Sequence, residues 1–328
     1  MKPSRLTSVL ESLLAQRWPA FIWGPPGVGK SSIVRHIAAA RGLPVIDLRA
    51  SLLDPTDLRG IPAIEGGRAV WCPPSFLPKP EDKPGVLFLD EINAAPPLVQ
   101  ASLYQLVLDR RVGEYVLPEG WWIVAAGNRQ QDRAVTFRMS SALANRFVHL
   151  ELEPDVDDWR TWALAHRVSP LVVSFIGVRP ALLSQEPGDT SAYPTPRSWE
   201  MASDVMTTMG GPKDAVDVMP GIVGQGAAVE FQAYAKKAIN EKAIRKVVES
   251  PQEADLPQDL DGTYMLTSWL AFHAAEPDVS QASAVLLQRL PPEFGVVLAR
   301  DMIKARPAFM KEPGYRDFLK THGHLMAR

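Results

Sequence analysis

Residues 24–31 read Gly-Pro-Pro-Gly-Val-Gly-Lys-Ser, the pattern G-x-x-x-x-G-K-[ST] that binds nucleotide phosphates. Its glycines let the backbone turn tightly around phosphate oxygens, and the N–H groups that start the next helix point at the anion. The sequence predicts that Lys30 reaches the β- and γ-phosphates and that the hydroxyl of Ser31 holds Mg²⁺. The predicted phosphate-binding residues are Gly24, Pro25, Pro26, Gly27, Val28, Gly29, Lys30, Ser31 and Ser32.

A pair of carboxylates ends a later apolar stretch. Residues 86–89 read Val-Leu-Phe-Leu, as in a buried strand, and Asp90 and Glu91 follow. In a nucleotide-binding sheet we expect this strand beside the first one, at residues 20–23, with Asp90 near the Mg²⁺ ion. Glu91 could then orient and polarise a water for attack on the γ-phosphate. Alone, the pair could equally end a strand in solvent, but the phosphate loop upstream favours the catalytic interpretation.

Two further polar side chains could complete such a site. Asn128 follows a predicted strand at residues 122–126 and could hydrogen-bond the attacking water, although asparagine is also a common turn residue. Arg146 lies where a short helix meets the last strand, in the segment Leu-Ala-Asn-Arg-Phe at 143–147. A guanidinium from a neighbouring subunit would stabilise charge that develops on the γ-phosphate. Arg146 is the favoured residue for this role, and Arg138 is its rival.

Strands alternate with helices up to about residue 153, which predicts a three-layer αβα unit around a parallel sheet. Gly-rich and Pro-rich sequence interrupts the pattern twice and indicates two small hairpins, at residues 60–76 and 111–117. The five predicted sheet strands are residues 20–23, 44–48, 86–90, 122–126 and 147–152. The predicted helices of this part are residues 6–16, 32–40, 97–110 and 140–145, and a further one begins at 54–58.

The pattern downstream is helical. We expect three regions, namely a nucleotide-binding core at 1–153, an α-helical lid at 154–249 and a linker with a C-terminal helical extension at 250–328. Arg197 stands in the first turn of a lid helix that Pro196 opens, and from there it could approach the phosphates. An ordinary exposed arginine is the alternative.

Composition limits the partners and the cellular location that we expect for the chain. The chain has 328 residues, a net charge of −2 and a single cysteine, Cys72. Near-neutral charge argues against nucleic-acid binding as the main activity, and a lone cysteine excludes internal disulfides. The sequence has no apolar run long enough to cross a bilayer and no unbroken apolar stretch typical of a signal peptide. We therefore expect a soluble cytoplasmic protein.

These motifs, in this order, resemble those of the AAA+ ATPases, and within them the MoxR-like branch. The segment Glu-Ile-Asn-Ala-Ala-Pro-Pro at 91–97 is close to the run that continues past Walker B in that branch. The matching motifs are Walker A at 24–31, Walker B at 86–91, sensor 1 at Asn128, the arginine-finger element at 143–147 and sensor 2 at Arg197. The two hairpins resemble the helix-2 insert and the insert before sensor 1.

The resemblance implies ATP and Mg²⁺ as ligands and a homo-oligomeric ring, usually a hexamer, with Arg146 serving a neighbour's site. It implies work on a protein partner, often one with a von Willebrand factor A domain, and it supports ATP over GTP. The first insert lacks a clear aromatic–apolar pore signature, which argues against polypeptide threading. Two other functions stay open: a motor subunit of a restriction-type nucleic-acid complex, and a non-catalytic nucleotide-dependent scaffold. The intact carboxylate pair argues against the scaffold.

Overall fold

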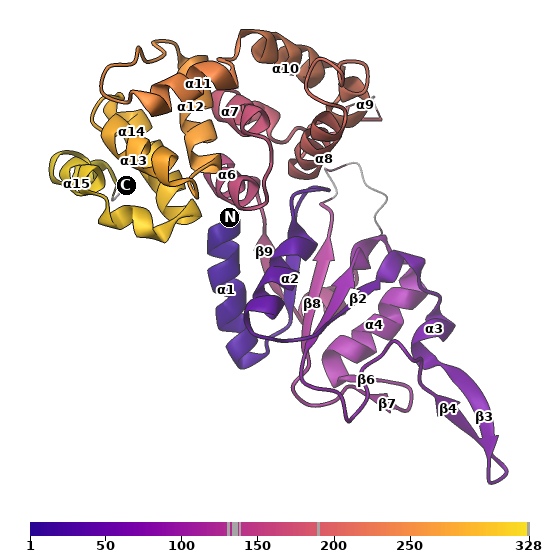
Figure 1. Cartoon of the computed structure of the whole chain (residues 1–328). Helices are drawn as coiled ribbons and strands as arrows, with labels where there is room; N and C mark the ends of the chain where they lie inside the picture. Colours follow the sequence, from indigo (N-terminus) through magenta and orange to yellow (C-terminus); the bar gives the residue numbers. More distant parts are fainter. Residues whose placement is uncertain (130–131, 133–136, 138, 189–190, 327–328) are drawn as a thin grey trace. The chain divides into compact units, whose positions relative to one another are not determined.

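The computed structural model describes residues 1–129, 132, 137, 139–188 and 191–326. The chain divides into two compact units, residues 1–154 and 155–328 (Figure 1). The sequence places the end of the nucleotide-binding core at residue 153, next to this division. None of the described helices has both the length and the apolar character that a membrane span needs.

A five-stranded parallel sheet forms the centre of the first unit, as the sequence predicts. In spatial order its strands are β2 (Val45–Arg49), β5 (Val86–Asp90), β8 (Trp122–Gly127), β1 (Ala20–Trp23) and β9 (Val148–Glu151). The expected adjacency of β5 and β1 is wrong, because β8 lies between them and pairs with both. The residues that follow β1, β8 and β5 therefore meet along one edge of the sheet.

Helices cover both faces of this sheet and complete the three-layer unit. Phe21 and Leu87 enter one hydrophobic cluster, whereas their chain neighbours Ile22 and Phe88 enter another on the opposite face. This alternation is the period of a strand buried on both sides. The helices of the unit are α1 (Pro3–Gln16), α2 (Lys30–Ala40), α3 (Pro55–Arg59), α4 (Pro97–Asp109) and α5 (Ser141–Ala144).

Both predicted hairpins are present, and the first projects away from the sheet (Figure 1). Gly60 opens the first hairpin with a φ of 85°, and a Cβ there would lie 1.9 Å from the Cys72 carbonyl oxygen, so the turn requires glycine. The backbone N–H of Trp71 donates to Glu114 in the second hairpin at 3.2 Å. The strands are β3 (Ile61–Glu65), β4 (Arg68–Cys72), β6 (Arg111–Val112) and β7 (Tyr115–Val116).

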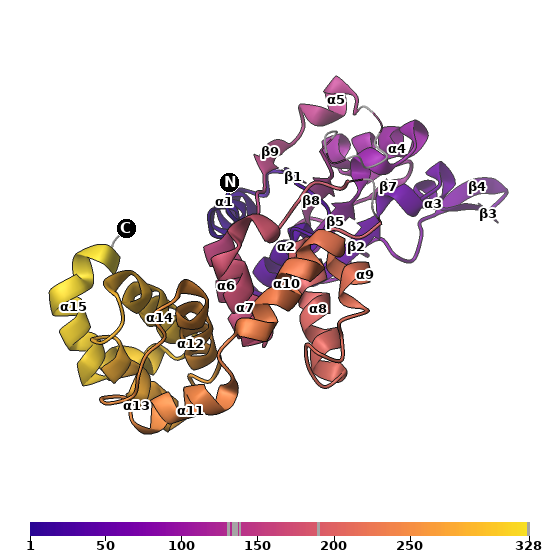
Figure 2. The same ribbon diagram turned by 90° about the horizontal axis from the view of Figure 1, so that it is seen from above.

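The second unit is helical; α13 and α14 pack against α12, and α15 packs against α13 and α14 (Figure 2). Its described helices are α6 (Val156–Ala165), α7 (Pro170–Val178), α8 (Pro196–Thr208), α9 (Met219–Val223), α10 (Gln225–Lys237), α11 (Glu241–Glu249), α12 (Leu260–Phe272), α13 (Pro277–Leu286), α14 (Pro292–Ala305) and α15 (Pro313–Met326).

The predicted lid, 154–249, and the predicted extension, 250–328, share one hydrophobic core. Helix α12 of the extension packs against α7 of the lid. Arg160 of α6 also forms a buried ion pair with Asp301 of α14, at 2.9 Å between Nη2 and Oδ2. The expected boundary after residue 249 therefore does not separate two compact units, because apolar surfaces on both sides of it bury one another.

Candidate functional site

The predicted phosphate loop connects β1 to α2, which is the strand–loop–helix arrangement that its pattern requires. Gly27 and Gly29 have φ values of 74° and 103°, in the region that favours glycine. Gly24 packs so closely that a Cβ there would lie 2.9 Å from the Leu152 carbonyl oxygen. No described side chain caps α2, which begins at Lys30. The amino end of a helix favours an anion, because its first N–H groups have no acceptor within the helix.

Lys30 and Asn128 are in direct contact at this loop. The Lys30 Nζ donates to Asn128 Oδ1 at 2.9 Å and to the carbonyl oxygens of Gly24 and Pro25 at 2.7 and 3.1 Å. Asn128 directly follows β8, the strand between β1 and β5. The ammonium group is thus held at the loop by oxygen atoms with which phosphate oxygens would compete for its protons.

Asp90 ends β5, and its carboxylate is half-buried. Burial raises the pKa of this carboxyl above its ordinary value, and the negative charges of Asp47 and Glu91 act in the same direction. The backbone N–H of Glu91, which donates to Asp90 Oδ1 at 3.0 Å, and the charge of Lys30 partly oppose this shift. A buried carboxylate near other acids is a hard oxygen ligand that a divalent cation would stabilise in its charged form, so Asp90 fits a Mg²⁺ site.

Glu91 turns the chain sharply after β5. Its φ is 56°, in the left-handed region, and it caps the short 3₁₀ helix η2 (Ile92–Ala94). The hydroxyl of Ser51 donates to Glu91 Oε2 at 2.5 Å. One carboxylate oxygen of the predicted catalytic residue is therefore engaged by a neighbouring side chain.

The sequence interpretation missed Ser51. Its place depends on the pairing of β2 with β5, in which Arg49 lies opposite Asp90. The chain then continues into η1 (Ala50–Leu52) beside η2, so Ser51 and Glu91 meet. No local pattern in the sequence indicates this contact, because it depends on β2 and β5 being parallel neighbours.

Arg146 lies at the opposite edge of the sheet from this cluster. It is exposed and stands between α5 and β9. In the parallel pairing of β9 with β1, Val148 is opposite Ala20 at the amino ends of the strands, whereas Lys30 follows the carboxyl end of β1 at Trp23. From Ala20 to Trp23, β1 makes three steps of about 3.3 Å, so these edges are about 10 Å apart.

Two further arginines are predicted for the site, Arg138 and Arg197. Arg138 lies outside the described residues. Arg197 belongs to the second unit, where it is exposed in the first turn of α8. Thr195 caps that helix, with its hydroxyl accepting from the Ser198 N–H at 3.0 Å, so the predicted helix start is present. The role of Arg197 stays a prediction.

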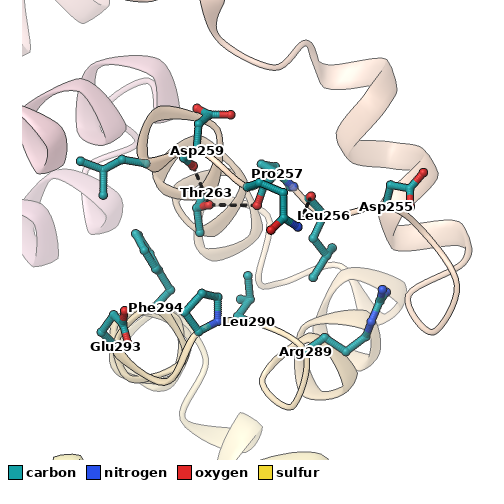
Figure 3. A pocket seen from close by; sticks show the side chains of 12 residues that line it. Asp255, Leu256, Pro257, Asp259, Thr263, Arg289, Leu290, Glu293 and Phe294 are labelled. Carbon is teal, nitrogen blue, oxygen red and sulfur yellow. Dashed lines mark hydrogen bonds between the residues drawn. The ribbon is translucent and has the colours of Figure 1, made fainter.

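A separate groove of about 740 Å³ lies in the second unit, where the segment before α12 faces the start of α14 (Figure 3). Leu256, Leu290 and Phe294 point into it, and Arg289 is turned to the carbonyl oxygens of Pro251 and Ala254. No predicted site residue lines this groove.

Solved structures of low sequence identity resemble the chain over most of its length. NtrX from Brucella abortus in complex with ADP gives a TM-score of 0.43 at 14% identity, covering 98% of this chain and 68% of that one. A RuvB variant from Thermotoga maritima gives 0.35 at 16% identity, covering 98% and 87%. Both TM-scores are below 0.5, so no functional conclusion rests on these two structures.

Residues 19–147 match the family described as AAA domain (dynein-related subfamily). Protein NorQ from Paracoccus denitrificans is 27% identical over 153 residues, which are 44% of this chain and 56% of that protein. The chain thus spans about half the length of the curated relative that it matches. The family match at residues 19–147 includes the phosphate loop, Asp90, Glu91, Asn128 and Arg146. Residues 19–147 of the first unit are thus similar to AAA domains, and 153 residues of the chain are similar to Protein NorQ.

Proposed function

We propose that this chain hydrolyses ATP with Mg²⁺ in a ring of identical subunits, six by resemblance, and remodels or matures a protein partner. One observation carries the catalytic part. Three neighbouring strands, β1, β8 and β5, end at one edge of the sheet, where Lys30 follows β1, Asn128 follows β8, and Asp90 and Glu91 stand at the end of β5. The Lys30–Asn128 contact and the electrostatic influence of Lys30 on Asp90 support a common site.

Each of these residues has a distinct proposed role. Lys30 and the loop amides bind the phosphates, and Ser31 and Asp90 hold Mg²⁺. The ion, when bound, neutralises charge on the phosphate oxygens. Glu91 orients and polarises the attacking water, and Asn128 responds to the γ-phosphate through the amide that now accepts from Lys30.

Arg146 is proposed to act on the nucleotide of a neighbouring subunit. Its backbone and the phosphate loop lie at opposite edges of the same sheet, which supports a role in trans. Its side chain is exposed and so accessible to a second copy. Repeating this head-to-tail contact generates a closed ring when the rotation between subunits closes.

The first hairpin supports a protein partner. Its pairing puts Ile61 and Val70 on one face and Ile64 and Trp71 on the other, so both faces are apolar. Ile61 and Ile64 are 74% and 84% exposed. A two-stranded hairpin with solvent-exposed apolar side chains on both faces gains stability when another protein covers it. A partner with a von Willebrand factor A domain is proposed from the family resemblance.

Glu91→Gln tests the catalytic core of this proposal. The amide keeps the size of the side chain but cannot take a proton from water, so we expect turnover to fall by about 100-fold or more. Nucleotide affinity should stay near wild type, because the phosphate loop is unchanged. Phosphate release, assayed with ATP and with GTP, and equilibrium binding of a fluorescent nucleotide check this.

Glu65→Gln, at the exposed tip of the first hairpin, is the matched control and should hydrolyse ATP at the wild-type rate. Wild-type turnover in Glu91→Gln would remove Glu91 from its role. A wild-type chain that releases no phosphate while it binds nucleotide would support the scaffold function instead.

A further inference from the structure

Asn93 is a buried polar residue between the two halves of the proposed site. It lies in η2, two residues after Glu91, and only 3% of it is exposed. Its side-chain Nδ2 donates to the backbone carbonyl oxygen of Asn128 at 2.7 Å. The backbone carbonyl oxygen of Asn93 accepts a hydrogen bond from the backbone N–H of Phe137 at 2.7 Å. The residue therefore binds the end of β8 from the turn that follows β5.

The hydrogen bond from Asn93 Nδ2 also fixes the orientation of the amide. Asn93 Oδ1 has no hydrogen-bond partner among the described residues. It faces Gly127, where a Cβ would lie 2.4 Å from this oxygen. Exchanging the nitrogen and oxygen of the amide would set an oxygen against the Asn128 carbonyl, so the hydrogen bond selects the present orientation.

A continuous set of contacts then joins the two proposed catalytic side chains. Glu91 begins η2 with its left-handed backbone, η2 carries Asn93, and Asn93 binds the main chain of Asn128. The Asn128 side chain in turn accepts from Lys30. Any shift of the β8 end relative to η2 would stretch the bond between Asn93 and Asn128.

We propose that Asn93 is a positioning residue that fixes the Asn128 backbone relative to Glu91, an inference that rests on the proposed ATPase function. Asn93 itself touches no nucleotide in this account. It sets the distance between the amide that meets the γ-phosphate and the carboxylate that holds the water. Such second-layer contacts keep reacting groups in their productive geometry.

A purely structural role is the competing interpretation. An apolar side chain would spare the protein the cost of an unpaired buried oxygen, but it would leave the Asn128 carbonyl without its donor. Gln100 offers a matched control in the same unit. It is 6% exposed, and its Nε2 donates to the Ala95 carbonyl oxygen at 3.0 Å, away from Asn128.

The test compares Asn93→Ala, Asn93→Asp and Gln100→Ala by kcat, KM, nucleotide affinity and Tm. We expect both Asn93 variants to lose about tenfold or more in kcat, with nucleotide affinity and KM within about twofold of wild type. Asn93→Asp keeps the shape of the side chain and sets a carboxylate oxygen against the Asn128 carbonyl, so it serves if the alanine variant folds poorly. Gln100→Ala should lose Tm but keep kcat.

Equal kcat in wild type and Asn93→Asp, or a kcat loss in Gln100→Ala as large as in Asn93→Ala, would overturn the proposal. Stability coupling supplies a readout without activity. Gly127→Ala should lower Tm less in an Asn93→Ala background than in wild type, although Phe21 also lies 2.9 Å from the added methyl. Inactivity of the wild-type chain would instead refute the proposed function, and this coupling would still report the packing of Asn93 on Gly127.

Discussion

Among single residues, Asp90 is expected to lower the stability of the ligand-free protein and, as the proposed Mg²⁺ ligand, to favour metal binding. Burial raises the pKa of its carboxyl, and Asp47 and Glu91 add to the shift. The folded protein therefore binds this proton more readily than the unfolded chain, so Asp90 lowers stability as the pH rises from the ordinary towards the raised pKa. We expect Asp90→Asn to raise the Tm of the nucleotide-free protein at neutral pH by about 2–4 °C. Thermal unfolding followed by circular dichroism measures it.

The same substitution should weaken stabilisation by MgATP. A ligand that binds only the folded state raises Tm, and the wild type should gain more than the Asp90→Asn variant because it keeps the carboxylate ligand. Without nucleotide, the Tm advantage of Asp90→Asn should shrink on acidification, as the wild-type carboxyl takes up its proton. A variant that melts below wild type at neutral pH without ligand would contradict this account.

Ser51 is expected to restrain Glu91. Its hydroxyl donates a hydrogen bond to one carboxylate oxygen of Glu91. That hydrogen bond must break before both oxygens of Glu91 can polarise water. Ser51→Ala should therefore raise basal kcat by about tenfold, because a hydrogen bond to a charged group contributes about 1.5 kcal/mol. Ser51→Thr keeps the hydroxyl and should stay near wild type. Steady-state phosphate release checks both, and a slower alanine variant would argue that Ser51 positions the carboxylate productively.

Candidate site residues that lie in short local patterns could be found from the sequence. Lys30, Ser31 and Asp90 each sit in a short pattern that contains its own structural context. Ser51 and Asn93 could not be found this way, because their contacts depend on strand pairing and on the left-handed turn at Glu91. A positive φ at a residue other than glycine has no strong signal in the sequence.

At the scale of elements, the strands were predictable but their order was not fully so. Continuous apolar runs indicate buried strands wherever they stand, whereas adjacency depends on which surfaces pack, and β8 rather than β1 is the neighbour of β5. The packing of the predicted lid against the predicted extension was unpredictable for the same reason, because it also depends on which surfaces meet. Arg160 and Asp301 pair across 141 positions of sequence, a contact that no local pattern reveals.

Substitutions in the Arg160–Asp301 ion pair test how strongly the packing of α6 against α14 stabilises the second unit. Arg160 is 3% exposed, so Arg160→Met leaves Asp301 buried without its partner and should lower the free energy of unfolding by about 3–5 kcal/mol. Arg160→Met combined with Asp301→Leu should recover most of this loss, because two packed apolar side chains need no ion pair. Urea denaturation measures both. Lys320→Met, which breaks the exposed pair with Asp317, is the control and should change little.

At the scale of the whole molecule, the proposed ring would give each subunit two halves of different sites. The carboxyl edge of its sheet holds Lys30, Asp90 and Glu91, and the amino edge carries Arg146. If Arg146 acts in trans, Glu91→Gln disables the site of its own subunit, and Arg146→Ala disables the site of a neighbour. The two variants therefore remove different halves of an interface.

Mixing the two variants should restore activity that neither has alone. An interface is complete when its phosphate loop comes from the Arg146→Ala chain and its arginine from the Glu91→Gln chain, so random equimolar rings should reach about a quarter of wild-type turnover. Each variant alone should still bind nucleotide. Glu91→Gln mixed with a chain that carries both substitutions is the control, because no complete interface can form. If assembled mixtures stay inactive, Arg146 does not act across the interface, and Arg138 becomes the residue to substitute next.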